Sequence, residues 1–225
     1  MKVYENENIQ VYLLELEIEK TGHITNTYIV KERKTNKVLV IDPAFNEQKI
    51  LEKIQEVDGK IEGVLITHSH ADHIAALAKL IENTGVKVYV HEQDLDGIWD
   101  ARLNEQEIVQ VVVEPVDKEN VQIIVDKEKI LLGDVEFEIM HTPGHTKGSI
   151  VIYSKKESVM FSGDTIFARS YGRTDLIAGS SEDMKKSLDK LFDTFEDIHV
   201  FPGHGEAFSL EQAKRGIRLL FAYKG

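Results

Sequence analysis

The sequence predicts a single α/β domain of 225 residues, and three observations support that prediction. Short apolar runs typical of buried strands alternate with amphipathic helices along the chain. Two strand–helix–strand units share one pattern, in which the first strand ends in Asp (Asp42, Asp164) and the second ends in His (His68, His204). The length suits one domain with its own hydrophobic core. We therefore expect two similar halves whose polar strand ends meet in one cleft.

The elements of the first half follow from local patterns. Strands are predicted at residues 11–18, 26–30, 38–42, 63–68 and 86–90. These segments are rich in branched and aromatic side chains or form short apolar runs. A helix is predicted at 46–57, where apolar residues recur at helical spacing until Gly59 ends it. A second helix begins near Ile74 and ends within 82–85.

The second half follows an acidic segment of mixed periodicity. We interpret this segment, residues 92–128, as an insertion or lid on a single domain that spans residues 1–225. It contains the only tryptophan, Trp99. Strands are predicted at 135–140, 149–154, 158–164 and 199–204, and helices at about 181–193 and from Leu210 to Tyr223.

The composition argues against several classes of function. The chain has no cysteine, which excludes disulfides, thiolate metal sites and a cysteine nucleophile. Its formal net charge is -12 without a basic stripe, so we expect no nucleic-acid partner. Acidic residues interrupt every apolar run near the N-terminus, and no run reaches the ~20 residues of a spanning helix. We therefore expect no signal peptide, no membrane association and a cytoplasmic location.

Residues 67–73, THSHADH, form the most informative motif. In an extended segment His68 and His70 point the same way, because side chains repeat every two residues, so both can reach one ion. Asp72 and His73 come where the chain turns into a helix, and this change of direction lets them reach a second ion. The alternative is a polar loop in which Asp72 caps the helix. The position of the motif between a buried strand and a helix favours metal ligands.

Three later segments each place one candidate ligand after a strand and among glycines. HTPGHTKGS, FSGDTIF and FPGHG supply His145, Asp164 and His204. The resulting five histidines and two aspartates are too many for one tetrahedral zinc with an open position. They suit two ions that share a carboxylate and a water. The four remaining histidines are assigned no ligand role: His23, His91, His141 and His199.

The motifs THSHADH, TPGHTKGS, SGDT and PGHG, in this order, resemble the metallo-β-lactamase superfamily over nearly the whole chain. The resemblance implies a four-layer αββα sandwich, with metals at the edge between two mixed sheets. It implies a first metal site formed by His68, His70 and His145. It implies a second site formed by Asp72, His73 and His204. Asp164 would bridge the two ions, and Asp42, in VIDP, would orient a ligand from behind.

Within that superfamily, SGDTIFARSYGRTDL is similar to the glyoxalase II-like branch. This resemblance implies a hydrolase with two zinc ions that cleaves a small thioester or ester by attack of a metal-bound hydroxide, with Asp72 as the catalytic proton acceptor. Di-iron flavoproteins of the superfamily carry Glu where this chain has His70, and the imidazole-rich set suits zinc, although iron and manganese also accept these ligands. Arg173 and Asp175 are candidate substrate contacts or, alternatively, a salt-bridged loop.

Two other activities remain open on the sequence. The GRTD stretch, residues 172–175, also resembles persulfide dioxygenases, which would use one iron held by His68, His145 and Asp164. A lactonase would open a cyclic ester at the same two-metal site. The acyl group, the thiol carrier and the oligomeric state are likewise left open.

Overall fold

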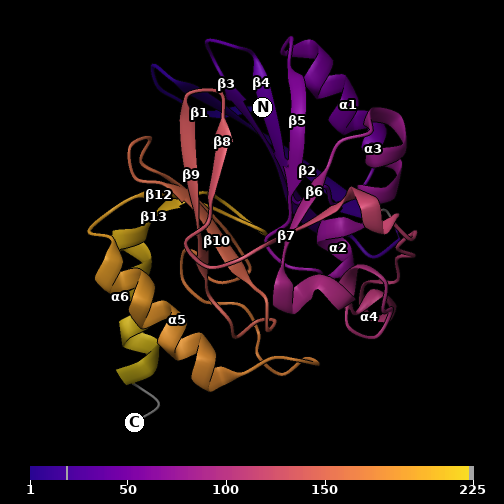
Figure 1. The fold of residues 1–225 in the computed structure, drawn as a ribbon. Helices are drawn as coiled ribbons and strands as arrows, with labels where there is room; N and C mark the ends of the chain where they lie inside the picture. The colour runs from indigo at the N-terminus through magenta and orange to yellow at the C-terminus, as the bar shows by residue number, and fades with distance from the viewer. Residues whose placement is uncertain (19, 223–225) are drawn as a thin grey trace.

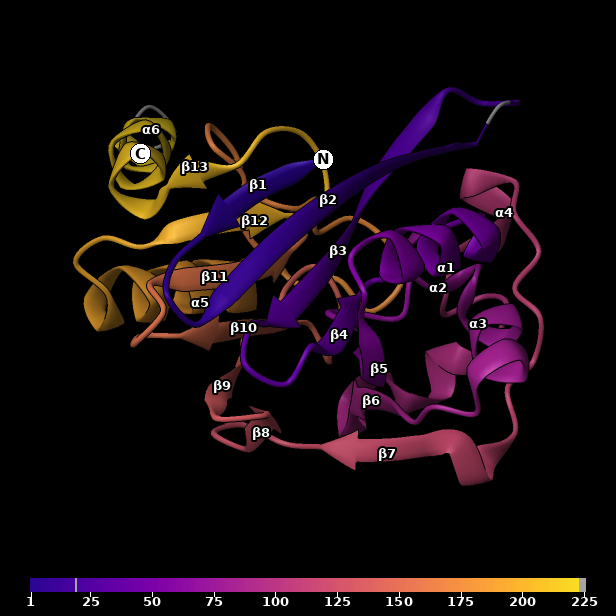
Figure 2. The ribbon, with the colours of Figure 1, turned by 90° about the horizontal axis from the view of Figure 1, so that it is seen from above.

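The computed structural model describes residues 1–18 and 20–222, with side chains up to residue 217. Two β-sheets pack face to face, and helices cover the outer face of each sheet (Figures 1 and 2). Three separate clusters of buried apolar side chains fill the interfaces between the resulting four layers. The predicted four-layer αββα sandwich is therefore confirmed.

The first sheet has seven strands in the order of the sequence. They are β1 (Lys2–Glu5), β2 (Ile9–Ile18), β3 (His23–Glu32), β4 (Lys37–Ile41), β5 (Lys60–Leu65), β6 (Val88–His91) and β7 (Val121–Ile124). Strands β1 to β4 pair antiparallel, and β4 to β7 pair parallel. The parallel strands β4 and β6 read as near-continuous apolar runs because both of their faces are covered.

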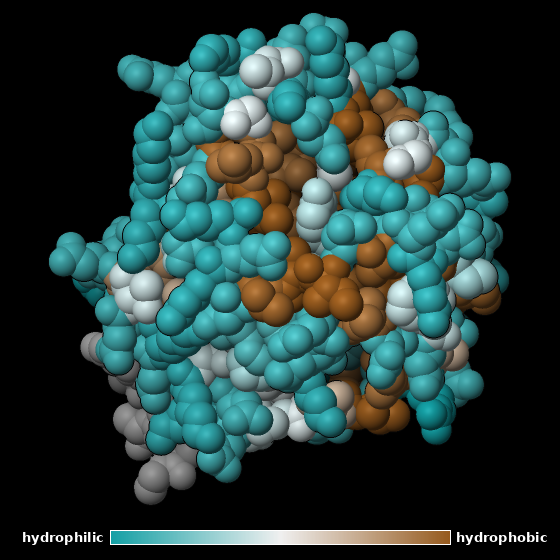
Figure 3. All heavy atoms as spheres, in the orientation of Figure 1, coloured by the Kyte–Doolittle hydropathy of each residue, from teal (hydrophilic) through white to brown (hydrophobic). Residues whose placement is uncertain are grey.

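The second sheet has six strands in the order β13-β12-β11-β10-β9-β8. They are β8 (Lys129–Leu132), β9 (Val135–His141), β10 (Ile150–Ser154), β11 (Val159–Gly163), β12 (His199–Pro202) and β13 (Phe208–Ser209). Only β11 and β12 pair parallel in this sheet. Strands β7 and β8 are edge strands of the first and second sheet, and Ile123 of β7 and Leu131 of β8 are exposed. On the face of the molecule drawn in Figure 3, apolar side chains are visible among hydrophilic ones.

Helices α1 (Glu47–Glu56), α2 (Ala71–Ile74) and α3 (Leu77–Thr84) lie on the first sheet. Helices α5 (Ser181–Thr194) and α6 (Leu210–Ala222) lie on the second. Tyr223, the predicted end of the last helix, lies outside the described residues. The side chains of Asn46 and Ser180 accept the backbone N–H groups of Lys49 and Asp183, which caps α1 and α5 at their starts. No described helix is long and apolar enough to cross a membrane.

The two repeated units of the sequence occupy equivalent places. In the first unit α1 connects the parallel strands β4 and β5, and in the second α5 connects the parallel strands β11 and β12. Asp42 follows β4 and Asp164 follows β11. Parallel strands end at the same edge of their sheet, so the polar residues after them are brought together. The predicted meeting of polar strand ends is what the structure shows.

The segment 92–128 is only partly an insertion. It contains the 3-10 helices η1 (Glu92–Ile98) and η2 (Lys118–Asn120) and the short helix α4 (Gln106–Val109). Its residues 121–124, however, form β7, the edge strand of the first sheet, so the predicted boundary at 128 lies too late. The indole of Trp99 is half-buried and donates a hydrogen bond to the carbonyl of Val116, which closes the segment on itself. A lid function for this segment stays a prediction.

Candidate metal centre

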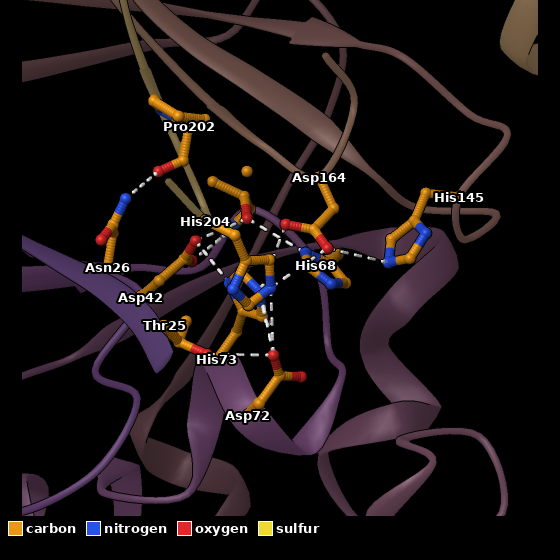
Figure 4. Close-up of polar contacts among 12 residues, drawn as sticks. Thr25, Asn26, Asp42, His68, Asp72, His73, His145, Asp164, Pro202 and His204 are labelled. Atoms are coloured by element: carbon orange, nitrogen blue, oxygen red, sulfur yellow. Dashed lines mark hydrogen bonds and ion pairs between the residues drawn. The ribbon is translucent and has the colours of Figure 1, made fainter. Parts of the chain in front are cut away.

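The predicted ligands lie at one edge of the sandwich, where loops that follow strands of both sheets meet. Residues 66–73 follow β5, residues 142–149 follow β9, Asp164 follows β11 and His204 follows β12. The side chains of the six candidate ligands labelled in Figure 4 point toward one another. The structure therefore brings together residues from distant parts of the sequence, as the strand-end pattern predicts.

The first group of ligands contains three buried histidines, His68, His70 and His145. One nitrogen from each lies within 4.8 Å of the other two. The ring centroids of His70 and His145 are 4.5 Å apart, and the ring centroids of His68 and His70 are 4.7 Å apart. His68 and His70 face the same side because one residue separates them in an extended segment. These three imidazoles could hold one ion.

The second group contains Asp72, His73 and His204. Asp72 Oδ2 lies 3.5 Å from His73 Nε2 and 3.3 Å from His204 Nε2. Asp72 and His73 lie in α2, directly after the extended segment, and the start of this helix turns their side chains to a different side from His70. The change of direction at residue 71 is thus what separates the two groups.

Asp164 lies between the two groups. Its Oδ1 is 3.5 Å from His73 Nε2, while its Oδ2 is 3.6 Å from His145 Nε2 and 3.4 Å from His204 Nε2. Donor atoms of a tetrahedral ion with bonds of about 2.1 Å are separated by about 3.4 Å. The carboxylate is therefore placed to serve ions on both sides.

Hydrogen bonds fix the tautomers of three of these histidines. Nδ1 of His73 lies 2.9 Å from Asp42 Oδ2, Nδ1 of His145 lies 2.8 Å from the carbonyl of Arg173, and Nδ1 of His204 lies 2.6 Å from the carbonyl of Ile24. A carbonyl or carboxylate oxygen only accepts, so each Nδ1 must carry the hydrogen. The neutral ring then presents the lone pair of Nε2 to the centre, as metal-bound histidines do.

Buried polar atoms without hydrogen-bond partners also indicate a metal centre. Within the described part of the chain, the buried Nε2 atoms of His68, His70, His73 and His145 and the Oδ1 atom of Asp164 have no hydrogen-bond partner. Buried polar atoms are nearly always satisfied, because leaving one unpaired costs about 1–3 kcal/mol. Five such atoms converging on one volume indicate that cations satisfy them.

The electrostatics of the metal-free centre divide the two groups. Burial and the neighbouring histidines lower the pKa of His68 well below its usual range, and burial lowers the pKa of His70 to about 3. Burial also acts to lower the pKa of His204, but the Asp164 carboxylate raises it to about 10. Burial also acts to lower the pKa of His73, but the carboxylates of Asp72 and Asp42 raise it, and the net effect is a pKa well above the usual range. His68 and His70 are thus neutral, and His73 and His204 protonated, before metal binding.

Asp42 lies behind the centre and supports it. The buried carboxylate accepts hydrogen bonds from the backbone N–H of Thr67 at 2.7 Å, from Thr67 Oγ1 at 2.7 Å and from His73 Nδ1 at 2.9 Å. The backbone of Asp42 has φ +51°, a left-handed conformation that Asp tolerates better than most residues. Asp42 therefore contacts His73, a candidate ligand of the second group, and its role in orienting that ligand stays a prediction.

Replacing Asp42 by Ala is expected to weaken zinc binding at the second group about 10- to 100-fold, because His73 loses the acceptor that orients it. Competition with a chromophoric chelator measures this affinity. Glu157→Gln is the matched control, since it neutralises another buried carboxylate, held by Asn6 and Asn8 in the turn before β11. Unchanged affinity in the Ala variant would contradict the orienting role.

Glycine is required where the ligands approach the backbone most closely. A Cβ atom at Gly203 would overlap Asp164 Oδ1 and the ring of His73. A Cβ atom at Gly163, where φ is +47°, would overlap the side chain of Thr67. The glycines of SGDT and PGHG therefore make room for the ligands as well as for the turns.

Asp94, which the sequence analysis did not identify, connects the two loops that carry the first group. Its buried carboxylate accepts hydrogen bonds from the N–H of Ser69 at 2.9 Å, from Thr146 Oγ1 at 2.9 Å and from the N–H of Gly148 at 2.7 Å. Ser69 lies between His68 and His70, and Thr146 follows His145. The sequence contains a signal for this residue, because Asp94, like Asp42 and Asp164, is an acidic residue shortly after a parallel strand, here β6.

Arg173 and Asp175 form an exposed ion pair rather than pointing at the ligands. Arg173 Nε and Nη2 donate to the two carboxylate oxygens of Asp175, each at 2.8 Å. The backbone carbonyl of Arg173 is the group that contacts the centre, through His145 Nδ1. The structure thus shows a supporting role for the backbone of this loop, and substrate contact by the two side chains stays a prediction.

An αββα sandwich with histidine and aspartate clusters at one edge defines a class of metal-binding proteins. The family model described as the metallo-beta-lactamase superfamily matches residues 21–204. The chain therefore belongs to this superfamily, whose members are metal-dependent hydrolases.

Two relatives have informative names. The probable metallo-hydrolase YqgX of Bacillus subtilis is 34% identical over 171 residues, covering 74% of this chain and 79% of the relative. The hydroxyacylglutathione hydrolase GloC of Haemophilus influenzae is 29% identical over 187 residues, covering 78% of this chain and 84% of GloC.

Three solved structures share the fold at 27% identity. BLEG-1, a B3 metallo-beta-lactamase, superposes with a TM-score of 0.81 and covers 90% of this chain and 95% of its own. TTHA1623, in a di-iron-bound form, superposes with a TM-score of 0.74 and covers 96% of this chain and 98% of its own. ETHE1 from Myxococcus xanthus superposes with a TM-score of 0.70 and covers 91% of this chain and 82% of its own. These likenesses support a divalent metal and leave its identity open.

Proposed function

We propose that this protein is a hydrolase with two zinc ions that cleaves a small thioester or ester. The observation that carries the proposal is the position of Asp164 between the two ligand groups, with its Oδ2 near His145 of the first group and His204 of the second, and its Oδ1 near His73 of the second. One ion would be held by His68, His70 and His145. The other would be held by Asp72, His73 and His204. A carboxylate between two such groups is the arrangement of a two-metal hydrolytic site.

Bound zinc lowers the pKa of a coordinated water towards neutrality and polarises a substrate carbonyl. The residues of the chain supply orientation and proton transfer. Asp42 and the carbonyls of Ile24 and Arg173 hold three imidazoles in fixed orientations through their Nδ1 atoms. Asp72 accepts the proton of the attacking water on its carboxylate. Burial of the centre, in which His204 alone among the seven candidate ligands is partly exposed, strengthens these electrostatic interactions.

Two arguments favour a thioester among the possible substrates. GloC, a relative of this chain, is named a hydroxyacylglutathione hydrolase, and such a substrate is a thioester. A thiol has a pKa of about 8.5, so a thiolate can leave without a proton donor. The absence of cysteine from the chain also agrees with direct attack by water rather than with a thiol acyl-enzyme.

A persulfide dioxygenase is the second candidate, because the GRTD stretch, residues 172–175, resembles such enzymes. That reaction would use one iron held by His68, His145 and Asp164. The metal content separates the two reactions, because the dioxygenase would bind one iron and the hydrolase two zinc ions.

The test of the proposed function is the metal content per chain after expression in medium balanced for zinc, iron and manganese, followed by activity assays. We expect close to two zinc ions per chain and hydrolysis of an acyl thioester in a panel that also contains acyclic esters and lactones. Asp164→Asn serves as the inactive comparison and Glu157→Gln as the control. Close to one iron per chain, with oxygen uptake on a persulfide, would replace the hydrolase by a dioxygenase.

A further inference from the structure

His23, one of the histidines outside the motifs, lies beside the second ligand group. It is the first residue of β3, and its Nε2 is 2.9 Å from Asp72 Oδ2. Its ring also makes an edge contact with His204, at 5.0 Å between ring centroids. Nitrogens of His23 and His204 and an oxygen of Asp72 lie within 4.8 Å of one another. The contact thus involves two of the candidate ligands at once.

The strand explains how a residue so distant in sequence reaches the centre. Side chains two residues apart on β3 share a face, and His23 and Thr25 both contact Asp72 Oδ2, at 2.9 and 3.1 Å. The intervening residue, Ile24, accepts the hydrogen bond from His204 Nδ1 with its carbonyl. Three consecutive residues of β3 therefore hold two ligands of the second group, which is more than a chance surface contact provides.

The chemistry of Asp72 defines what His23 does. A carboxylate oxygen only accepts hydrogen bonds, so Nε2 of His23 must carry the hydrogen. When a metal takes the Nε2 lone pairs of His73 and His204, those two rings can no longer donate to Asp72. His23 and Thr25 then remain as the donors that fix the position of the carboxylate.

We propose that His23 is a positioning residue of the metal centre, which holds Asp72 by the Nε2 hydrogen bond and so raises the affinity of the second metal site. The proposal rests on the two-metal centre proposed above. It assigns His23 no direct bond to the ion. Donors behind a ligating carboxylate act in this way, and their removal costs about 10- to 100-fold in metal affinity.

The experiment compares metal binding by two variants. The metal-free protein and its His23→Ala and His23→Gln variants are titrated with Zn²⁺ in competition with a chromophoric chelator. Ala removes the donor, whereas Gln keeps an N–H donor near the position of Nε2 but not the imidazole. We expect the Ala variant to lose about 10- to 100-fold in affinity for one ion only, and the Gln variant to stay within about threefold of the wild type.

His199→Ala is the matched control, because His199 is an exposed histidine that contacts Tyr4 at the opposite end of β12 from His204. Equal affinities in the Ala variant and the wild type would overturn the proposal. A Gln variant as weak as the Ala variant would overturn the hydrogen-bonding role, since the imidazole itself would then be needed. A wild type that binds only one ion would overturn both this proposal and the two-metal centre. If the wild type binds two ions but cleaves no thioester, only the proposed thioester substrate is contradicted.

Discussion

Replacing Asp72 by Asn is expected to lower kcat by about 10²- to 10⁴-fold, the usual contribution of proton transfer by a positioned side chain, while KM changes little. Asn keeps a side-chain oxygen that can face a metal, but it cannot take a proton from the attacking water. The loss should therefore appear in turnover and not in substrate binding.

The electrostatics of the metal-free centre keep Asp72 ionised. Burial acts to raise the pKa of Asp72, but the charge of His73 and hydrogen bonds from His204 and His23 lower it well below the usual range. The carboxylate is therefore ionised at neutral pH, which is the state that can accept a proton.

Steady-state kinetics on protein of known metal content test the prediction. The comparison requires both metals to be bound in the Asn variant, so metal content is measured on the same sample. Glu157→Gln again provides a neutralised buried carboxylate outside the centre and should retain wild-type turnover. If the fully loaded Asn variant turns over at the wild-type rate, the proton acceptor is another group.

The candidate ligands could be identified from the sequence, and their approach to one another predicted, because their signals are local. THSHADH contains four of them within seven residues, and the glycine-rich turns after strands mark the other three. The alternation of strand and helix likewise predicts parallel strands whose ends meet at one edge. The order of the sheets and the sandwich itself came from the family resemblance, because apolar patterns alone do not say which sheet a strand joins.

The residues that support the ligands could not be predicted in the same way. His23 and Asp72 are 49 positions apart, and nothing within β3 marks His23 as different from any other polar residue near a turn. Short edge strands such as β1, β8 and β13 have few residues in which to show an alternating pattern, and β7 was hidden in the acidic segment. Partners that act across the fold become visible only when the strands are placed side by side.

Removing the metals is expected to destabilise the fold substantially. A ligand present at 1,000 times its Kd stabilises the native state by about 4.1 kcal/mol, and for a protein of this size each 1 kcal/mol shifts Tm by roughly 2–4 °C. Loss of one ion under such conditions should lower Tm by roughly 8–16 °C. The buried Nε2 atoms and the Asp164 oxygen would then face one another without a cation. Thermal unfolding with and without a chelator, followed by restoration of zinc, measures the shift.

The two ions are expected to leave at different pH values. Metal binding requires unprotonated ligands, so an ion competes with protons wherever the pKa of a ligand in the metal-free fold lies above the working pH. His204, with a pKa of about 10, and His73, whose pKa is also raised, bind protons at neutral pH. His68 and His70 do not, because burial lowers their pKa values, that of His70 to about 3. Affinity at the second group should therefore fall steadily from about pH 9 to 6, whereas protons on His68 and His70 do not compete with the ion at the first group in this range. Zinc titrations across this range, repeated with His204→Ala, test the order, and simultaneous loss of both ions would contradict it.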